Sequence, residues 1–169
     1  MIRRATAADA AAIAEVHVRT WQAAYAHVFG AERLGRITAE RRLPMWHEIL
    51  VSPEVAAFVA EEEARVVGFC TVGRSREADA DGELQAIYVL PDVWGTGAGP
   101  ALMRAGLDEL RAAGRRDAIL WVLEDNPRAR RFYEREGWAL DGERREGEYV
   151  GVRTVEVRYR RSLEDRNLV

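Results

Sequence analysis

The sequence has very few of the features that stabilise secreted proteins or anchor membrane proteins. Cys70 is the only cysteine, so neither a disulfide within the chain nor a cysteine-rich metal site can form. No run of about 18 consecutive apolar residues occurs, which predicts the absence of a membrane-spanning helix. We do not expect Arg3 and Arg4 to begin an export signal, because Asp9 and Glu15 interrupt the segment that follows. We therefore expect a cytoplasmic protein with no bound metal and no membrane partner.

A surplus of charge of one sign is also missing. The 169 residues include 25 Lys and Arg against 28 Asp and Glu, for a formal net charge of −3. Binding to nucleic acid through a broad basic surface needs a positive surplus, so we expect no nucleic-acid partner. With 48% hydrophobic residues, this length suits a single core. We predict one domain over residues 1–163 and a polar tail over 164–169.

The hydrophobic pattern predicts one short strand, two helical stretches and then three strands in the first half of the chain. Thr6 is a typical helix cap, with Asp9 three residues later, and the apolar residues that follow recur at helical spacing. The other elements expected here are a strand at 2–4, a helical stretch over 31–50 interrupted near Pro44, and strands at 56–60, 66–73 and 83–90.

Residues 89–104 carry the strongest chemical signal, because an apolar strand leads through Gly95, Gly97 and Gly99 into an amphipathic helix. Glycine has no Cβ, so such a loop can take positive φ angles and point its amides at an anion. The helix that follows adds the unpaired N–H groups of its first turn and the positive end of its dipole. This stretch predicts a pyrophosphate site.

The second half of the chain predicts the remaining elements of a mixed α/β fold. The helix after the glycine loop buries Leu102, Met103, Leu107 and Leu110 and ends at Gly114. The other expected elements are a strand at 118–123, a helix from Pro127 to Gly137 capped by Asn126, and a hairpin of strands at 138–145 and 155–160 that turns at Glu146-Gly147. The result is a twisted mixed sheet of six to seven strands, flanked by about four helices.

Three segments occur in an order typical of one family: residues 83–89, the loop 94–99, and residues 126–138 with Phe132-Tyr133. Together they resemble the GNAT superfamily of N-acetyltransferases over nearly the whole chain. One position departs from the pattern, because the family commonly has Arg or Gln where this sequence has Trp94. Backbone amides supply most of the phosphate contacts, so the departure removes at most one side-chain contact.

The resemblance implies a single domain whose sheet is splayed at the cofactor site, and direct transfer from acetyl-CoA to an amine. The pantetheine arm is expected to pair with a strand edge, and an amide near Val89 to polarise the thioester. Pro100 can donate nothing, whereas Arg128, Arg130 and Arg131 are candidates for the nucleotide phosphate. The implied cofactor-binding residues are Ile87, Tyr88, Val89, Trp94, Gly95, Thr96, Gly97, Ala98, Gly99, Ala101, Asn126 and Tyr133.

Aminolysis needs a neutral amine and a proton for the departing sulfur. The resemblance assigns the acid role to Tyr133, although Tyr133 and Phe132 also suit a packed aromatic pair. Glu83 is the candidate base, acting directly or through water, and its alternative role is a solvated residue at a strand start. Glu124 and Asp125 are the other candidates for the base.

His17, Trp21 and Tyr25 recur every four residues on one face of the first helix, with Trp46 and His47 farther along the chain. Such a stripe is either a core face or the wall of an acceptor pocket. We predict a small-molecule amine or a peptide amine as acceptor, and the sequence leaves a homodimer open.

Two other functions can also use a glycine-rich loop. A dinucleotide oxidoreductase requires Gly-x-Gly-x-x-Gly, and the last position counted from Gly95 is Pro100. A non-catalytic acyl-CoA sensor of the same fold remains open, because it would use the same loop.

Overall fold

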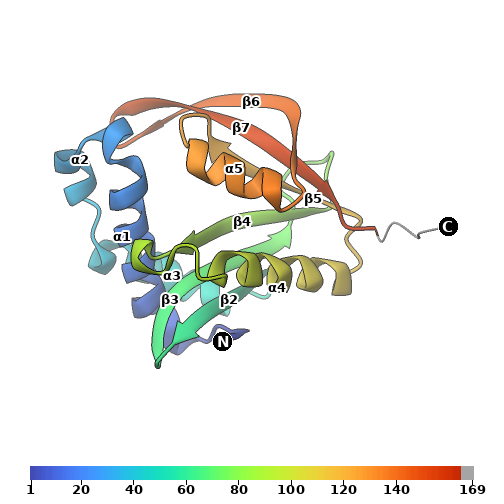
Figure 1. The fold of residues 1–169 in the computed structure, drawn as a ribbon, viewed down its shortest axis with the longest axis horizontal. Helices are drawn as coiled ribbons and strands as arrows, with labels where there is room; N and C mark the ends of the chain where they lie inside the picture. Colours follow the sequence, from blue (N-terminus) through green and yellow to red (C-terminus); the bar gives the residue numbers. More distant parts are fainter. Residues whose placement is uncertain (165–169) are drawn as a thin grey trace.

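The computed structural model describes residues 1–164 (Figure 1). The helices are α1 (Ala10–Phe29), α2 (Ala31–Gly35), α3 (Ala39–Val51), α4 (Ala98–Ala112) and α5 (Pro127–Arg135), with 3-10 turns at Ala7–Asp9 and Pro91–Val93. The strands are β1 (Ile2–Arg4), β2 (Val55–Glu62), β3 (Arg65–Arg74), β4 (Gly82–Val89), β5 (Asp117–Leu123), β6 (Ala139–Tyr149) and β7 (Val152–Ser162).

The strands form one seven-stranded sheet in the order β1-β2-β3-β4-β5-β7-β6. Among the strands of residues 1–164, only β4 and β5 pair in parallel, and they do so at just two positions, Gly82 with Ala118 and Glu83 with Ile119. Beyond these pairs the two halves of the sheet diverge, with α4 beside the β2–β4 half and α5 beside the β5–β7 half (Figure 1). The predicted mixed, splayed sheet is confirmed.

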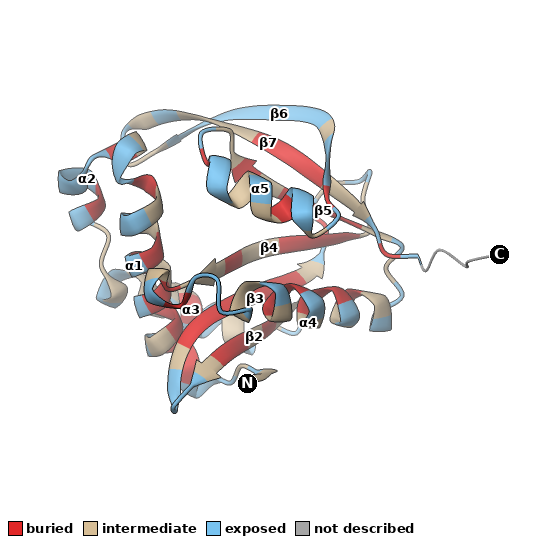
Figure 2. Cartoon of the chain, viewed as in Figure 1, coloured by how far each residue is buried: buried red, intermediate tan, exposed pale blue. Residues whose placement is uncertain are grey.

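The core lies where α1 and α4 pack against β3 and β4, and Figure 2 shows the buried residues concentrated along these strands. The predicted apolar stripe of α4 is confirmed: Leu102, Met103, Leu107 and Leu110 are all buried. Gly106 allows a close approach, because a Cβ there would lie 2.9 Å from Val72. Cys70 is also buried, and desolvation raises the pKa of its thiol to about 12. An unreactive core thiol agrees with its place in β3.

The predicted helical stretch over 31–50 is interrupted at a different place from the one expected. The structure has two helices there, α2 and α3, separated by residues 36–38, and Pro44 lies inside α3. The Thr38 side chain accepts a hydrogen bond from the Arg41 N–H at 3.2 Å and thereby starts α3. Pro44 removes one N–H from the hydrogen bonding of α3, and α3 nevertheless continues through it to Val51.

The turn between the last two strands also differs from the prediction. Glu146 and Gly147 lie within β6, paired with Val155 and Thr154. The chain turns instead at Val150 and Gly151, whose φ angles are +45° and +79°. Positive φ at both central residues is the mark of a type I′ hairpin turn, and valine rarely adopts positive φ. This is why the sequence favoured the Glu-Gly pair.

The end of the described chain still belongs to the core. Leu163 is buried, and its N–H donates to the Arg116 carbonyl at 2.9 Å. Of the predicted polar tail over 164–169, Glu164 is exposed and the rest lies outside the described residues. Within residues 1–164, no helix is both long and apolar enough to cross a membrane.

Candidate active site

A cavity of about 1360 Å³ fills the divergence between β4 and β5. Its lining comes from both halves of the sheet, from α1, from the glycine loop, from α5 and from the β6–β7 hairpin. The cavity therefore joins segments that are far apart in the sequence. A ligand bound there would contact both diverging strands at once.

The glycine loop forms one end of this cavity. Gly95 and Gly97 have φ angles of +79° and +92°, and Gly97 is the N-cap of α4. The N–H groups of Gly95, Gly97, Ala98 and Gly99 have no acceptor within residues 1–164. Four free amides at the start of a helix suit an anionic ligand.

Two predicted amide donors are not free. The Thr96 N–H and hydroxyl both donate to the Val93 carbonyl, at 3.4 and 2.7 Å. The Ala101 N–H donates to the Gly97 carbonyl at 3.1 Å, as the first full turn of α4 requires. The expected donor set therefore loses Thr96 and Ala101 and retains the amides of Gly95, Gly97, Ala98 and Gly99.

The end of β4 exposes backbone groups to the cavity. The Leu90 N–H donates to Val67 of β3 at 2.8 Å. Because backbone groups alternate in direction along a strand, the N–H and carbonyl groups of Ile87 and Val89 point the other way, towards the gap. The backbone of Tyr88 faces β3, so only its side chain reaches the cavity. The predicted edge for pantetheine therefore reduces to Ile87 and Val89.

Tyr133 lies on α5 and is buried, with its side chain lining the cavity. Its ring centroid is 5.6 Å from that of Phe132, so the two rings also pack together. The Tyr133 hydroxyl has no hydrogen-bond partner among the described side chains. Burial raises the pKa of this phenol, and Tyr25 raises it further. Tyr133 thus keeps its proton at neutral pH.

Asn126 connects the start of α5 to α1. Its side-chain oxygen accepts a hydrogen bond from the Ala129 N–H at 3.2 Å, which confirms the predicted helix cap. Its side-chain amide donates to the Tyr25 hydroxyl at 3.0 Å. Both residues line the cavity, so this contact orients α5 relative to the wall opposite.

Glu83 lies at the point where β4 and β5 separate. It pairs with Ile119 across the two strands, and only 5% of the residue is exposed. Its carboxylate lies 3.4 Å from the guanidinium of Arg76. Burial raises the pKa of Glu83, and the charge of Arg76 opposes that rise. A buried carboxylate with a raised pKa beside a cavity is suited to accept a proton.

The two alternative carboxylates have different surroundings. Glu124 pairs with Arg144 at 3.1 Å and does not line the cavity. Asp125 does line it, but its side chain is 75% exposed and lies 3.5 Å from His27. Glu83 is therefore the one buried carboxylate of these three that faces the cavity.

The predicted acceptor stripe divides in the structure. Trp21 and Tyr25 line the cavity, but His17 does not. The His17 ring accepts a hydrogen bond from the Trp46 indole at 3.2 Å and stacks on Tyr88. Burial, helped by the charge of Arg42, lowers the pKa of His17 to about 4. His17 is thus a partly buried, neutral residue outside the cavity lining, and its role in acceptor binding stays a prediction.

Sequence patterns missed one residue of this wall. Tyr149, at the end of β6, has its ring centroid 4.6 Å from that of Trp21. Its hydroxyl accepts a hydrogen bond from Arg42 at 2.5 Å. This contact forms because the β6–β7 hairpin lies over the end of α1 (Figure 1). No local signal near residue 149 predicts it.

Comparison with known proteins agrees with this arrangement. Residues 11–138 match the Acetyltransferase (GNAT) family. The chain is 33% identical over 129 residues to the uncharacterized N-acetyltransferase YuaI of Bacillus subtilis, covering 75% of this chain and 73% of the relative. The chain belongs to the GNAT acetyltransferase family.

Two further comparisons extend over most of this GNAT acetyltransferase. The uncharacterized N-acetyltransferase Mb2688 of Mycobacterium bovis is 33% identical over 155 residues, covering 87% of this chain and 98% of the relative. The solved structure of YncA, a putative acetyltransferase from Salmonella typhimurium with its cofactor acetyl-CoA, matches with a TM-score of 0.72 at 22% identity. It covers 99% of this chain and 95% of that chain. The predicted fold is thereby confirmed.

The three candidate phosphate arginines of this GNAT acetyltransferase have different positions. Arg128 lines the cavity. Arg130 donates to the Tyr159 hydroxyl and to the Glu124 carbonyl, both at 3.1 Å, so it is engaged in holding α5. Arg131 is exposed and does not line the cavity. Only Arg128 remains as a candidate phosphate contact.

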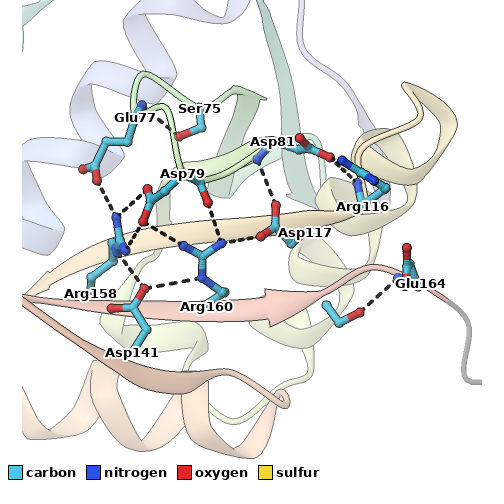
Figure 3. A network of polar contacts seen from close by, with 11 residues as sticks. Ser75, Glu77, Asp79, Asp81, Arg116, Asp117, Asp141, Arg158, Arg160 and Glu164 are labelled. Carbon is cyan, nitrogen blue, oxygen red and sulfur yellow. Dashed lines mark hydrogen bonds and ion pairs between the residues drawn. The ribbon is translucent and has the colours of Figure 1, made fainter.

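A network of charges fastens the loop between β3 and β4 to strands β6 and β7 (Figure 3). Its centre is Arg158 of β7, whose side chain is only 4% exposed. Arg158 pairs with Glu77 and Asp79 of the loop and with Asp141 of β6. Its hydrogen bonds to Asp79 hold the pKa of that carboxyl below its usual value. The same loop carries Arg76 to Glu83.

We expect Arg158→Met to lower the free energy of unfolding by about 2–3 kcal/mol, because three carboxylates lose their shared cation. Breaking a fully buried pair costs about 3–5 kcal/mol, and the effect is smaller here because the side chain of Asp79 is 57% exposed. Urea unfolding measures the change. Arg153→Gln is the matched control on β7: its pair with Glu146 is exposed, and it should change stability by less than about 0.5 kcal/mol. Equal losses in the two variants would contradict the network's role.

Proposed function

We propose that this GNAT acetyltransferase moves an acetyl group from acetyl-CoA directly to a primary amine inside the cavity. The observation that carries the proposal is the position of the cavity, which joins the free amides of the glycine loop to buried Glu83 and Tyr133. One end suits a phosphate and the other suits proton transfer. The likeness to a fold that holds acetyl-CoA in YncA supports the same ligand here.

The free amides of the glycine loop would hold the pyrophosphate of the coenzyme. The cavity-facing backbone of Ile87 and Val89 offers the pantetheine arm the pairing that an added strand would find. The Val89 N–H would polarise the thioester carbonyl. Asn126 orders this region by capping α5 and holding Tyr25.

Two protons must move during the transfer. The amine attacks in its neutral form, and an ammonium would first release one proton to solvent. As the nitrogen attacks the thioester carbon, Glu83, directly or through one water, takes the one proton that this nitrogen loses. As the new C–N bond forms and the C–S bond breaks, Tyr133 gives its proton to the sulfur. Glu83 gains one proton and Tyr133 loses one, so the number of protons on the enzyme does not change. Exchange with solvent then restores both groups.

The acceptor end of the cavity combines aromatic rings with polar groups. Trp21, Tyr25 and Tyr149 supply an apolar wall, and buried Glu83 lines the same cavity. Pockets with apolar walls and few polar groups select small organic ligands, so a small-molecule amine or a peptide amine fits best. We place the reaction in the cytoplasm, where a lone reduced cysteine is normal.

A thiol-release assay with acetyl-CoA and a panel of amines tests the proposal. We expect free thiol to appear in proportion to the acetylated product for at least one primary amine. The panel should hold small amines, amino acids and peptides with free N-termini. The alternative, a non-catalytic acyl-CoA sensor, predicts binding of the coenzyme in calorimetry with no thiol release from any amine.

A further inference from the structure

Two residues that line the cavity of this acetyltransferase from different elements contact each other. Trp94 follows β4, and Arg128 lies in the first turn of α5, after β5. The guanidinium carbon of Arg128 lies 3.1 Å from the centroid of the Trp94 ring. Because β4 and β5 no longer pair beyond Glu83, the contact between Trp94 and Arg128 links the two halves of the sheet where the strands have separated.

Trp94 is held in place by its own hydrogen bond. The indole N–H donates to the Val89 carbonyl at 2.8 Å, which fixes the ring against the end of β4. The residue is 37% exposed, and its free face carries Arg128. A guanidinium over an indole face is attracted by the negative potential of the ring and loses freedom of movement.

Arg128 has no acidic partner. No carboxylate lies within ion-pair distance of Arg128, Arg131 or Arg135 in the part of the chain that the structure describes. Burial lowers the pKa of Arg128, and the charges of Arg135 and Arg131 lower it further. A cation that is partly desolvated, close to like charges and fixed on an aromatic face is stabilised by an incoming anion.

The free amides of the glycine loop face the same space. Gly95, Gly97 and Gly99 line the cavity together with Trp94 and Arg128. An anion there would meet backbone N–H groups from one wall and a guanidinium from the other. The family pattern commonly has Arg or Gln where this chain has Trp94, so the charge in this chain stands on the opposite wall.

We propose that Arg128, positioned by the Trp94 ring, is the cation that binds a phosphate group of coenzyme A. Trp94 acts through Arg128 as a positioning residue. The inference rests on the proposed function, because it assumes that the cavity takes the coenzyme. The coenzyme would then be held by a positively charged side chain of α5 in addition to the backbone amides of the glycine loop.

Calorimetric titration with coenzyme A tests the assignment. We expect Arg128→Gln and Trp94→Ala each to weaken binding by about tenfold or more, the effect of one charge-assisted phosphate contact. Trp94→Phe keeps an aromatic face and should lose only about two- to threefold. Arg104→Gln is the matched control, because Arg104 is exposed on α4 and does not line the cavity. Arg104→Gln should bind coenzyme A with the same affinity as the wild type.

Pantetheine, which lacks phosphates, separates charge recognition from a structural effect. Its affinity should be the same in the wild type and in Arg128→Gln, and an equal loss for both ligands would overturn the proposal. Titration with 3′-dephospho-CoA then locates the contact. If the wild type still binds this ligand about tenfold more tightly than Arg128→Gln does, Arg128 contacts the pyrophosphate. If the two proteins bind it equally well, Arg128 contacts the 3′-phosphate.

A charge-restoring double variant gives an independent readout. Trp94→Arg combined with Arg128→Gln returns a cation to the loop, and we expect part of the lost coenzyme affinity to return. If the wild type binds no coenzyme A, the proposed function fails. If the wild type binds it and Arg128→Gln binds it equally well, only this inference fails.

Discussion

Tyr133→Phe is expected to lower kcat by about 100-fold or more, the usual effect of removing a positioned acid. The phenyl ring still packs against Phe132 and still lines the cavity, so the affinity for coenzyme A should stay within about twofold of the wild type. The lost group is a hydroxyl without a partner in the described chain, so stability should not fall. Thiol-release rates at saturating acetyl-CoA measure the change.

Tyr159→Phe is the matched control for Tyr133→Phe. Tyr159 is a buried tyrosine that does not line the cavity, and its hydroxyl bonds with Arg130 and Glu134. Its removal should lower the free energy of unfolding by about 1 kcal/mol and leave kcat near the wild-type value. Full turnover by Tyr133→Phe would mean that the sulfur leaves as a thiolate or takes its proton from water.

The parts of the site that the sequence predicted are those built from local signals. The glycine loop, the buried stripe of α4 and the Asn126 cap each depend on residues within a few positions of one another, and each forms as predicted. The same short-range patterns placed the helix break at Pro44 and missed Thr38, because a cap depends on a single hydrogen bond.

The parts that the sequence could not supply depend on contacts between distant elements. Tyr149 reaches Trp21 only because a hairpin crosses α1. Arg158 meets Glu77 across 81 positions of the chain. For His17, the helical spacing with Trp21 predicted a shared face of α1 but not what that face contacts. Trp21 lines the cavity, whereas His17 packs against Trp46, a residue of another helix.

The sheet divergence explains why these distant contacts gather in one place. Parallel strands β4 and β5 keep only two paired positions, so their later backbone groups have no neighbour to bond with. Buried backbone groups need partners, and in this fold Trp94 supplies one of them at the Val89 carbonyl. The remaining groups on Ile87 and Val89 stay available to a ligand, so the site is a gap in the sheet that a substrate can complete.

Glu83→Gln is expected to lower kcat/KM at neutral pH by about 100-fold and to flatten its dependence on pH. Glu83 must be deprotonated to accept a proton, so activity should fall as the pH drops through its pKa. Burial raises that pKa, while Arg76 and Arg145 oppose the rise and Glu77 adds to it. The acidic limb of the profile should therefore lie above the usual range of a glutamate, and Gln at this position removes it.

Stability gives Glu83→Gln a second readout with a definite sign. A carboxyl whose pKa is higher in the folded state than in the unfolded state destabilises the fold as the pH rises above the unfolded value. A neutral Gln lacks this penalty, so the melting temperature at neutral pH should rise while activity falls. This opposite movement separates a functional carboxylate from a merely structural one.

Two further variants decide between Glu83 and its alternatives. Arg76→Gln removes the cation that lowers the pKa of Glu83, so the acidic limb should move to higher pH while the plateau at alkaline pH stays. Glu124→Gln should keep the wild-type profile, because that carboxylate pairs with Arg144 away from the cavity. If Glu83→Gln instead kept the acidic limb unchanged, the amine would have to lose its proton to another group, and Asp125 at the cavity rim would be the next residue to replace.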